Sequence, residues 1–243
     1  MAKSSGLGMR LFIGGYDLSG DVGAIDNIST PRGVLEVPGI DKSAMERVLT
    51  HADASISFTS FFNKTGDAWA LLSALPTAEQ TVLVLKASTR EASALGMTGR
   101  QINYDPSRPA DGSLSISTQV QGSSGVAPGW GLMLTAGKET HASAGSTAGI
   151  DNSSSTSQGL GIWAHAFSLS SGAPTLIVQD SANGSDWATL QTLTINGARE
   201  HEYIVKSGTI RQHLRITTTG SFSNFAVAVM ARRFTADDLE AAA

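Results

Sequence analysis

Histidines and carboxylates are the side chains best suited to metal binding or acid–base chemistry, so their spacing is considered first. The chain contains five histidines: His51, His141, His165, His201 and His213. No two of them lie three to five residues apart, which excludes the local histidine pair used by many zinc sites. His165 follows Trp163 and precedes Phe167 on one face of a predicted strand. We interpret it as a core or boundary histidine, and we expect His51 and His141 to be solvated.

Carboxylates are frequent in the first part of the chain, at Asp17, Asp21, Asp26, Glu36, Asp41, Glu46 and Asp53. Two convergent carboxylates can carry out glycoside hydrolysis, so a glycan-active enzyme is one hypothesis. Any acidic, loop-rich segment supplies such pairs, however, and the sequence has no nucleophile elbow, phosphate-binding loop, dinucleotide fingerprint or calcium loop. The absence of cysteine excludes disulfides, thiolate zinc sites and a cysteine nucleophile. We predict no enzyme, no metal and no cofactor.

The chain that carries these residues has a low fraction of charged side chains. Its 243 residues are 41% hydrophobic and only 16% charged, with a net charge of −4. This composition suits a packed core under a surface of Ser, Thr, Gly and Asn. It lacks the basic excess with which nucleic-acid-binding proteins neutralise phosphate. No apolar run is long enough for a membrane span or a signal peptide, so we expect no membrane partner.

The residue pattern predicts a mainly β fold with one short helix in the first half. Residues 54–62 and 114–120 alternate apolar and polar side chains, which is typical of half-buried strands. Residues 81–85 form a short apolar run, and residues 11–13 and 34–37 are further strand candidates. Between Asp67 and Leu75 the apolar residues fall at helical spacing. Asp67 is a candidate N-cap, and Pro76 cannot continue the helix.

A polar segment divides the chain in this interpretation. Residues 136–158 contain one large aliphatic residue, Ile150, and are rich in Gly, Ser and Thr. We predict a first domain at 1–137, a flexible linker at 138–158, a β-sandwich of immunoglobulin-like or jelly-roll type at 159–234, and a loose tail at 235–243. The second domain should contain about six strands with an Asn183-Gly184 hairpin turn. Its predicted strands span residues 162–169, 175–180, 188–193, 202–206, 211–217 and 225–232.

Two features favour a protein that associates with copies of itself. The polar faces of the predicted strands carry uncharged side chains, whereas solvated edges usually carry protective Lys or Glu. They comprise Ser55, Ser57, Thr59, Ser115, Ser117 and Gln119. A Ser/Thr-rich composition alone explains them equally well. The second feature is a long loop at residues 38–53, whose charged residues are Asp41, Lys42, Glu46 and Arg47. Long loops inside compact domains are usually functional, and charges of both signs favour docking on a complementary copy.

Several segments resemble tail proteins of long-tailed phages that infect actinobacteria, in particular the major tail tube protein. They are residues 16–21 (YDLSGD), 37–48 (VPGIDKSAMERV), 56–63 (ISFTSFFN), 72–77 (LSALPT), 101–106 (QINYDP) and 111–114 (DGSL). The order of strand, long loop, strand, helix and strands is also similar to the tail-tube fold. The resemblance covers most of residues 9–137. The second half is similar, more loosely, to β-sandwich domains appended to such proteins.

The resemblance implies a tail-tube-type β-barrel or sandwich whose copies form rings, usually hexameric, that stack into a hollow conduit for DNA. The loop at 38–53 would be the stacking loop, with Asp41, Lys42, Glu46 and Arg47 as contacts between rings. The strands near 55–62 and 113–121 would form the ring sheet, with the six uncharged residues facing the lumen or the next subunit. The helix would pack outside that sheet. The tape-measure protein and the tail terminator and tip proteins are the implied partners, and the virion tail, assembled in the host cytoplasm, is the implied location.

The second domain would decorate the tube exterior. Trp187, after the Asn-Gly turn, is the aromatic most expected to be exposed, so weak contact with cell-surface glycans is one interpretation and inert decoration the other. Two further hypotheses remain open. One is a minor tail or capsid decoration protein with a carbohydrate-binding-like β-sandwich. The other is the glycan-active enzyme considered above. Copy number in the virion separates the tube subunit from the decoration protein.

Overall fold

The computed structural model describes residues 6–123 and 127–235 of the chain. Its described elements are β1 (Arg10–Ile13), β2 (Tyr16–Asp17), β3 (Val22–Ser29), β4 (Arg32–Glu36), β5 (Arg47–Ala52), β6 (Ser55–Phe61), α1 (Asp67–Leu72), β7 (Gln80–Leu85), β8 (Ser93–Ser107), β9 (Ser115–Gly122), β10 (Gly129–Met133), β11 (Glu139–His141), β12 (Gly145–Ser146), β13 (Ile150–Asp151), β14 (Leu160–Ser168), β15 (Ser171–Gly172), β16 (Thr175–Ser181), β17 (Ala188–Thr192), β18 (Glu200–Lys206), β19 (His213–Thr219), β20 (Phe222–Ser223) and β21 (Phe225–Arg233). The predicted mainly β fold is confirmed.

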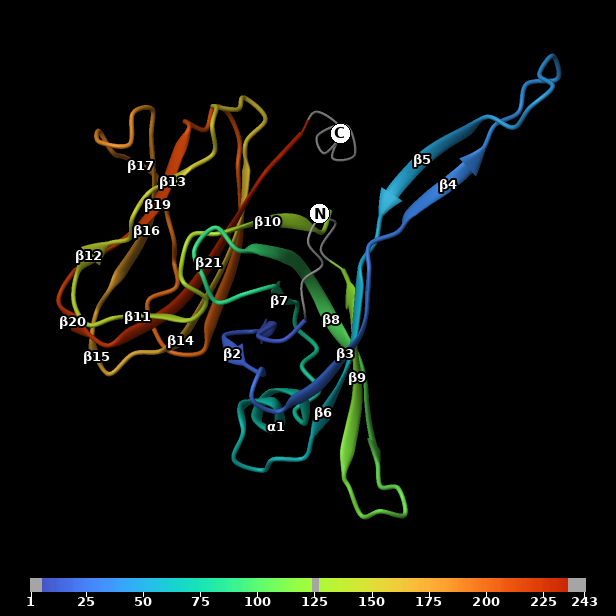
Figure 1. Cartoon of the computed structure of the whole chain (residues 1–243), viewed down its shortest axis with the longest axis horizontal. Coiled ribbons are helices and arrows are strands. Elements are labelled where there is room, and N and C mark those ends of the chain that lie inside the picture. The colour runs from blue at the N-terminus through green and yellow to red at the C-terminus, as the bar shows by residue number, and fades with distance from the viewer. Residues whose placement is uncertain (1–5, 124–126, 236–243) are drawn as a thin grey trace.

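One twelve-stranded sheet runs through both halves of the chain (Figure 1). Its main path is β18-β14-β21-β10-β8-β7-β1-β2, with β3, β6, β9 and β11 attached off this path. The long strand β8 is shared between two parts of this sheet. Its first half pairs with β7 and β10, and its second half pairs with β9. Strands β9, β6 and β3 continue from there, so they form a four-stranded unit with the second half of β8.

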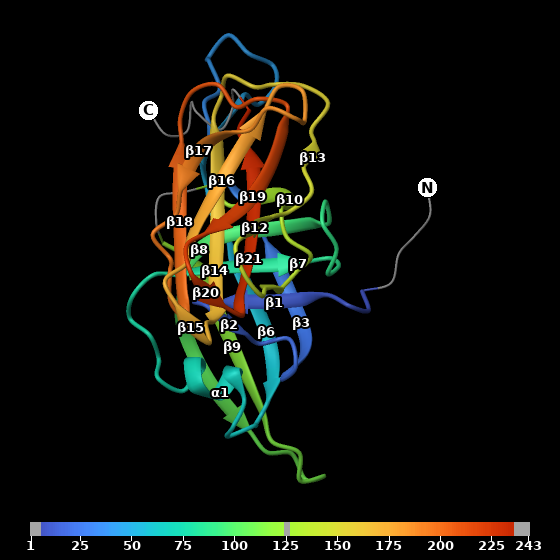
Figure 2. The ribbon, with the colours of Figure 1, turned by 90° about the vertical axis from the view of Figure 1, so that its left-hand side faces the viewer.

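The second half of the chain forms a sandwich. A separate sheet of order β12-β19-β16-β17, with β13 also paired to β19, faces β14 and β21 (Figure 2). Leu176 and Val178 from β16 and Ile216 from β19 are fully buried against Ile162 and Val227 from the opposite sheet. Each such aliphatic side chain contributes about 1.5–3 kcal/mol by leaving water. All six strands predicted for this half are confirmed within a few residues.

Three apolar clusters hold the fold together, and one of them joins the two halves. The joining cluster packs Phe12 and Leu83 of the first half against Trp163, Phe167 and Met230 of the second. Gly96 of β8 lies directly beneath it. A Cβ atom at Gly96 would lie 2.3 Å from the Met230 side chain and 2.7 Å from the Trp163 ring. The backbone therefore lies so close to these two side chains that only glycine fits at this position.

The helix is shorter than predicted and has a different cap. α1 ends at Leu72, Gly66 is the N-cap residue, and no side chain caps the helix. Asp67 lies in the first turn and forms an ion pair with Arg199 at 3.7 Å. Ala68, Leu71 and Leu72 pack in the same cluster as Ile56, Phe58 and Val120. The helix therefore covers the apolar face of β6 and β9, opposite their polar face.

The segment predicted as a flexible linker contains secondary structure. Residues 138–158 hold β11, β12 and β13, which pair with β21 and β19. Their backbones supply the ladder hydrogen bonds, and strands of two or three residues are too short to show a period in sequence. Ile150, the single aliphatic residue, is 1% exposed in the sandwich core. The division into domains at 137, 158 and 234 stays a prediction, and residues 236–243 of the predicted tail lie outside the described residues.

The long loop predicted at 38–53 is largely a hairpin. Residues 47–52 form β5, which pairs with β4, and the connecting segment is confined to residues 37–46. Figure 1 shows β4 and β5 projecting from the body as a two-stranded arm, here called the β4–β5 arm (residues 32–52). At the opposite end of the molecule, the connection between β8 and β9 projects in the other direction, as both ribbon views show (Figures 1 and 2).

Candidate assembly surfaces

The six uncharged residues predicted for the ring sheet lie on one outward face. In β6 the residues alternate strictly, with Ile56, Phe58 and Ser60 buried and the intervening residues turned outward. β9 alternates in the same way. Because the register pairs Ser57 with Gln119 and Thr59 with Ser117, the outward residues of the two strands are direct neighbours. The sequence period therefore predicted this face correctly, and its position toward a lumen stays a prediction.

Strands β3 and β8 extend this face into a polar wall, defined as the outward residues of β3, β6, β9 and residues 100–107 of β8. The rows across it pair Asn27, Ser57, Gln119 and Asn103, with further polar rows on either side. Its acidic groups accept hydrogen bonds from polar neighbours: Asp26 from the Thr59 hydroxyl at 3.0 Å and Asp105 from the Asn103 amide at 2.6 Å. Just outside the wall, Asp53 accepts from the Gln121 amide at 2.8 Å.

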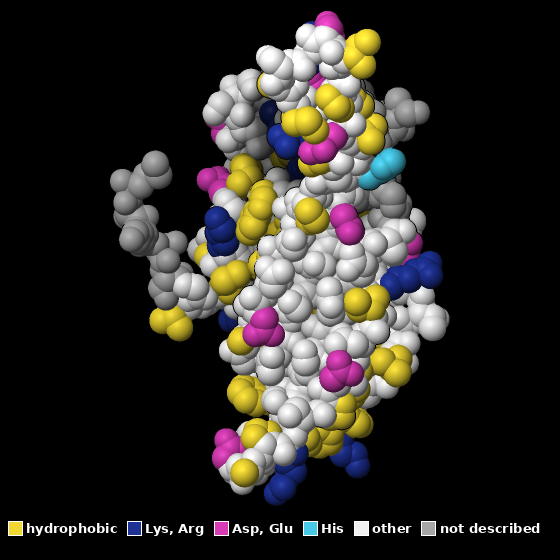
Figure 3. Space-filling model, turned by 90° about the vertical axis from the view of Figure 1, so that its right-hand side faces the viewer, with side chains coloured by type: hydrophobic (Ala, Val, Ile, Leu, Met, Phe, Trp, Pro, Cys, Tyr) yellow, Lys and Arg dark blue, Asp and Glu magenta, His cyan; other side chains and the backbone are white. Residues whose placement is uncertain are grey.

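Basic groups are scarce on this wall. Arg100, in the row of Gln121 at one end, lies 3.7 Å from Glu79. Figure 3 views the molecule from the side of this sheet: uncharged side chains and backbone cover most of the surface, acidic groups are scattered over it, and Lys and Arg lie toward its margins. Such a surface offers few cations for phosphate groups to bind.

Both outer strands of the four-stranded unit have a free edge within the described chain. β3 pairs only with β6, and residues 100–107 of β8 pair only with β9. The three pairings are all antiparallel, so strand direction alternates from β3 through β6 and β9 to β8. Unpaired edges present backbone N–H and C=O groups that can pair with another chain. The exposed edges carry few of the lysines that usually prevent this, and Ile102 on β8 is 57% exposed.

The β4–β5 arm is apolar and almost entirely exposed. Its large hydrophobic side chains are between 41% and 109% exposed, and they are Val34, Leu35, Val37, Ile40, Met45, Val48 and Leu49. An isolated two-stranded hairpin is only marginally stable in water. Apolar side chains on both faces of such a hairpin indicate a surface that is covered in an assembly.

The charged residues predicted to contact another ring are mostly paired within the arm. Lys42 lies 3.6 Å from Glu46, and Arg47 lies 3.2 Å from Glu36. Exposed pairs of this kind contribute little stability. Because these charges are paired within the arm, its exposed apolar side chains are the main groups that pack against nothing in the described chain. The role of Asp41, Lys42, Glu46 and Arg47 between rings stays a prediction.

A second apolar surface lies at the other end of the β3–β6 pair. The arm leaves this pair beside Ser29 and Ser55, whereas Phe61 lies at the far end. Phe61 is 56% exposed and Phe62 is 42% exposed, and the Phe62 amide donates to the carbonyl of Leu114 at 3.2 Å. We call Phe61, Phe62 and Leu114 the end patch. The arm and the end patch thus lie at opposite ends of one molecule.

A buried histidine fixes the two halves to one another. The Gly15 amide donates to Nδ1 of His165 at 3.1 Å, and Nε2 of His165 lies 3.1 Å from the Thr81 hydroxyl. Because an amide N–H can only donate, Nδ1 must be unprotonated, and the neutral ring carries its proton on Nε2. Burial, aided by the nearby His201, lowers the pKa of His165 to about 3. The interpretation of His165 as a core residue is confirmed.

His141 differs from its prediction. It lies in β11, and burial lowers its pKa even though the nearby Glu139 acts in the opposite direction. Its Nε2 atom is buried without a hydrogen-bond partner. The prediction of a solvated residue was wrong because the surrounding segment is paired with the sandwich. His51, in the arm, is exposed as expected.

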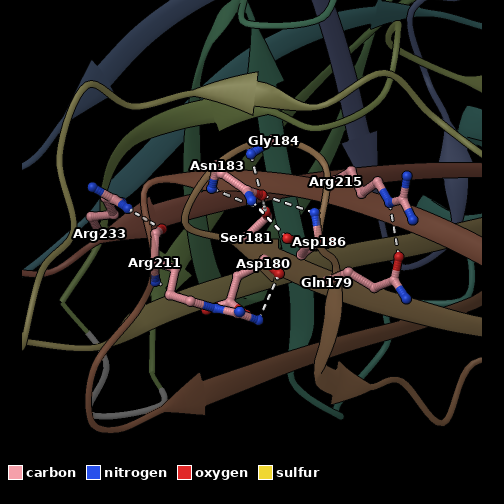
Figure 4. Close-up of polar contacts among 9 residues, drawn as sticks. All are labelled: Gln179, Asp180, Ser181, Asn183, Gly184, Asp186, Arg211, Arg215 and Arg233. Atoms are coloured by element: carbon pink, nitrogen blue, oxygen red, sulfur yellow. Dashed lines mark hydrogen bonds and ion pairs between the residues drawn. The ribbon is translucent and has the colours of Figure 1, made fainter.

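The outer sandwich holds a polar cluster between β16 and β19 (Figure 4). Asp180 is 4% exposed, and both of its oxygens accept from Arg211: the side-chain Nε at 2.9 Å and the backbone amide at 3.0 Å. This hydrogen bonding raises the pKa of Arg211. Arg233 donates to the carbonyl of Arg211 at 2.6 Å. Figure 4 shows these groups directed toward one another, so the cluster ties β16 to the chain leading into β19 and to β21.

Trp187 is not the exposed aromatic that the sequence suggested. The Arg215 guanidinium lies 4.2 Å from the centroid of its ring, and Gly149 packs beside it. The Asn183-Gly184 pair does lie in the loop between β16 and β17, but the loop spans six residues and is ordered by the Asn183 side chain, which accepts from the Ser185 and Asp186 amides. Trp130, on β10, is 46% exposed, and no sequence signal distinguished it.

The early carboxylates do not converge on one another in these contacts. Asp21 accepts from Asn63, Asp17 lies 3.7 Å from Lys138, and Glu36 pairs with Arg47. Across residues 6–123 and 127–235, no group of three or more His, Asp or Glu side chains is arranged to hold a metal ion. In the same ranges, no helix is long and apolar enough to cross a membrane.

No protein-family model matches the chain, and no curated protein matches it. Among solved structures, the chain is similar to the tail of an empty GTA particle with C6 symmetry, at 15% identity and a TM-score of 0.41, over 54% of this chain and 98% of that one. It is also similar to the SPP1 Dit protein, described as a hub adsorption apparatus in phages that infect Gram-positive bacteria, at 10% identity and a TM-score of 0.35, over 93% and 99% of the two chains. A protein of the phage p2 baseplate is similar at 8% identity and a TM-score of 0.36, over 93% and 98%.

Proposed function

We propose that this chain is a structural subunit of a phage tail, and more specifically the major tail tube subunit. The observation that carries the proposal is the four-stranded unit with two free edges. Because its strands alternate in direction and are even in number, β3 of one copy can pair antiparallel with residues 100–107 of β8 in the next copy, related by rotation. Repetition of this contact closes a β-barrel ring, which removes the edges.

The polar wall would then line the ring. The helix and the apolar clusters lie on the opposite face of the same sheet, so the outer sandwich would lie outside the barrel. A wall of Ser, Thr, Asn and Gln with scattered carboxylates would let DNA pass without specific binding, since it offers few cations to the phosphates. The sequence resemblance supports hexameric rings, a tape-measure protein inside the tube, terminator and tip proteins at its ends, and a location in the virion tail.

The β4–β5 arm would connect successive rings. It is apolar, exposed and directed away from the body, and the end patch lies at the opposite end of the same strand pair. Contact between the arm of one copy and the end patch of the next is head-to-tail, and such contacts propagate into open, stacked assemblies. Burial of the arm against a neighbouring ring would also supply the partner that an isolated hairpin lacks.

The experiment tests the edges directly. Ile102→Lys places a charge on the free edge of β8, and Val205→Lys is its matched control, because Val205 is 53% exposed on the outer strand β18 of the sandwich. We expect the wild-type chain and Val205→Lys to form rings or tubes visible by electron microscopy, and Ile102→Lys to stay monomeric with an unchanged circular dichroism spectrum.

Assembly of Ile102→Lys as readily as Val205→Lys would contradict ring closure through β8. Copy number distinguishes the decoration hypothesis: a tube subunit should be among the most abundant proteins of purified virions, whereas a minor tail protein should be scarce. Low copy number together with a monomeric wild-type chain would overturn the proposal.

A further inference from the structure

A cleft of about 320 Å³ lies where β10 joins the sheet of the first half to that of the second. Its floor is apolar, formed by Leu132, Leu134, Leu214 and Ala231, and its rim carries Ser93, Trp130, Asn152 and Arg233. The volume is at the lower end of the range of small-molecule sites. The cleft is separate from the polar wall, the free edges and the arm.

Trp130 gives the cleft a flat apolar surface. It lies on the same face of the chain as Leu132 and Leu134, because side chains two residues apart in a strand point the same way. Its ring is 46% exposed, and the Lys86 ammonium lies 4.9 Å from the ring centroid. An exposed indole combines an apolar face with an N–H donor at its edge, which suits a ligand that has both apolar and polar surfaces.

One charged residue, Arg233, lines the cleft, and the Lys86 ammonium lies over the Trp130 ring beside it. The Arg233 guanidinium donates to the backbone carbonyls of Ser154, Arg211 and Gln212. Within the described chain, no carboxylate oxygen forms an ion pair with Arg233 or Lys86. Burial lowers the pKa of Arg233, and the more distant Asp180 only partly offsets this effect. Arg233 therefore brings to the cleft a positive charge with which no carboxylate of the described chain forms an ion pair.

A peptide that adds as an extra strand does not fit this cleft. β10 already pairs with β8 on one side and with β21 on the other, so its backbone offers no free edge. A ligand must instead use the indole face, the two cations and the side chains of Ser93 and Asn152. The Asn152 amide nitrogen donates to the Gln212 carbonyl at 3.1 Å, which leaves the amide oxygen as the acceptor.

We propose that this cleft binds an acidic saccharide. The C–H face of the sugar ring packs on Trp130, the carboxylate lies between Lys86 and Arg233, and hydroxyl groups bond to Asn152 and Ser93. This saccharide binding does not depend on the proposed assembly into tubes. It places sugar binding at the junction of the two halves, on the exposed Trp130, and not on the half-buried Trp187.

The test compares methyl β-D-glucuronoside with methyl β-D-glucoside, by ligand-observed NMR and by titration of tryptophan fluorescence. A hydrogen bond to a charged group contributes about 1.5–3 kcal/mol, so we expect the glucuronoside to bind roughly tenfold or more tightly than the glucoside. Trp130→Ala should weaken both ligands by roughly tenfold or more. Trp187→Phe is the matched control and should bind both ligands as the wild type does.

Two variants separate charge recognition from folding. Arg233→Gln should reduce the affinity for the glucuronoside to that for the glucoside. Arg233 also donates hydrogen bonds to three backbone carbonyls, so its replacement can unfold the sandwich. Lys86 is exposed, so Lys86→Gln avoids this problem. We expect Lys86→Gln to lose affinity for the glucuronoside and to keep its affinity for the glucoside. No saturable binding of the glucuronoside, equal affinity for the two sugars in the wild type, or unchanged binding by Trp130→Ala would each overturn the proposal.

Discussion

Acid should weaken this fold through His165, because the folded chain disfavours its protonated form. The pKa of His165 falls from 6.5 in the unfolded chain to about 3 in the folded protein. Between about pH 3 and pH 6.5, His165 therefore binds a proton more readily in the unfolded chain than in the folded protein. The contribution of His165 to stability is fully present above about pH 6.5 and is lost as the pH falls toward about pH 3. Protonation would also place an N–H on Nδ1 against the donating Gly15 amide.

The magnitude follows from the pKa difference. One pKa unit corresponds to about 1.36 kcal/mol, and the unfolded His165 is already half protonated at pH 6.5, so a decrease from about pH 6.5 to about pH 4.5 should remove about 2.3 kcal/mol through this residue. Urea unfolding at the two pH values measures the change in the free energy of unfolding. The variant His165→Gln keeps one donor and one acceptor but cannot titrate, so its loss over this range should be smaller than that of the wild type by that amount.

His51→Gln is the control for the loss of a histidine, because His51 is exposed in the arm. Burial also lowers the pKa of His201 and His141, so part of the acid sensitivity should remain in His165→Gln. Equal pH dependence in the wild type and in His165→Gln would refute the assignment of a buried, neutral His165 as the acid-sensitive link between the halves.

Four further outcomes are expected. Gly96→Val should lower the free energy of unfolding by about 1–3 kcal/mol in urea titrations, because its side chain would enter the joining cluster; an unchanged midpoint would contradict the close approach. Leu49→Glu should prevent ring stacking while single rings still form in electron micrographs, whereas Val205→Glu, with similar exposure, should stack normally; stacking by both would exclude an apolar arm contact. Ser117→Lys should give assembled tubes a DNA affinity in filter binding that falls with salt, with a slope near one per added phosphate contact, and salt-independent binding would argue against a charge effect. Asp180→Ala should cost about 1–2 kcal/mol by removing the carboxylate that accepts from the Arg211 side chain and amide, and an unchanged melting temperature would count against that pair.

The sequence predicted those elements whose side chains alternate with a regular period. β6 and β9 were evident because Ile56, Phe58, Ile116 and Val120 face the core at every second position. β3 was not evident in the sequence. Bulges after Val22 and after Ile25 place its inward-facing residues three positions apart, so they do not alternate. The first half of β8 was missed for another reason: its residues are buried on both faces and include two glycines, so no alternation remains.

Surfaces formed by contacts distant in sequence were the least predictable. The part of the polar wall on β6 and β9 could be found because these two strands have a clear period. The contacts of Lys86 with the Trp130 ring and of Arg215 with the Trp187 ring each join residues that are more than twenty-five positions apart in the sequence. The charges of the arm were recognised in sequence, but their pairing with one another required the hairpin register that brings Arg47 opposite Glu36.

The most direct measurement is a cryo-electron microscopy map of the assembled protein at a resolution that separates strands. We expect neighbouring copies to be joined by antiparallel pairing of residues 22–29 with residues 100–107, with Ser57 and Gln119 turned to the central channel. A map in which these two segments remain unpaired, or in which the channel is lined by the outer sandwich, would contradict the account.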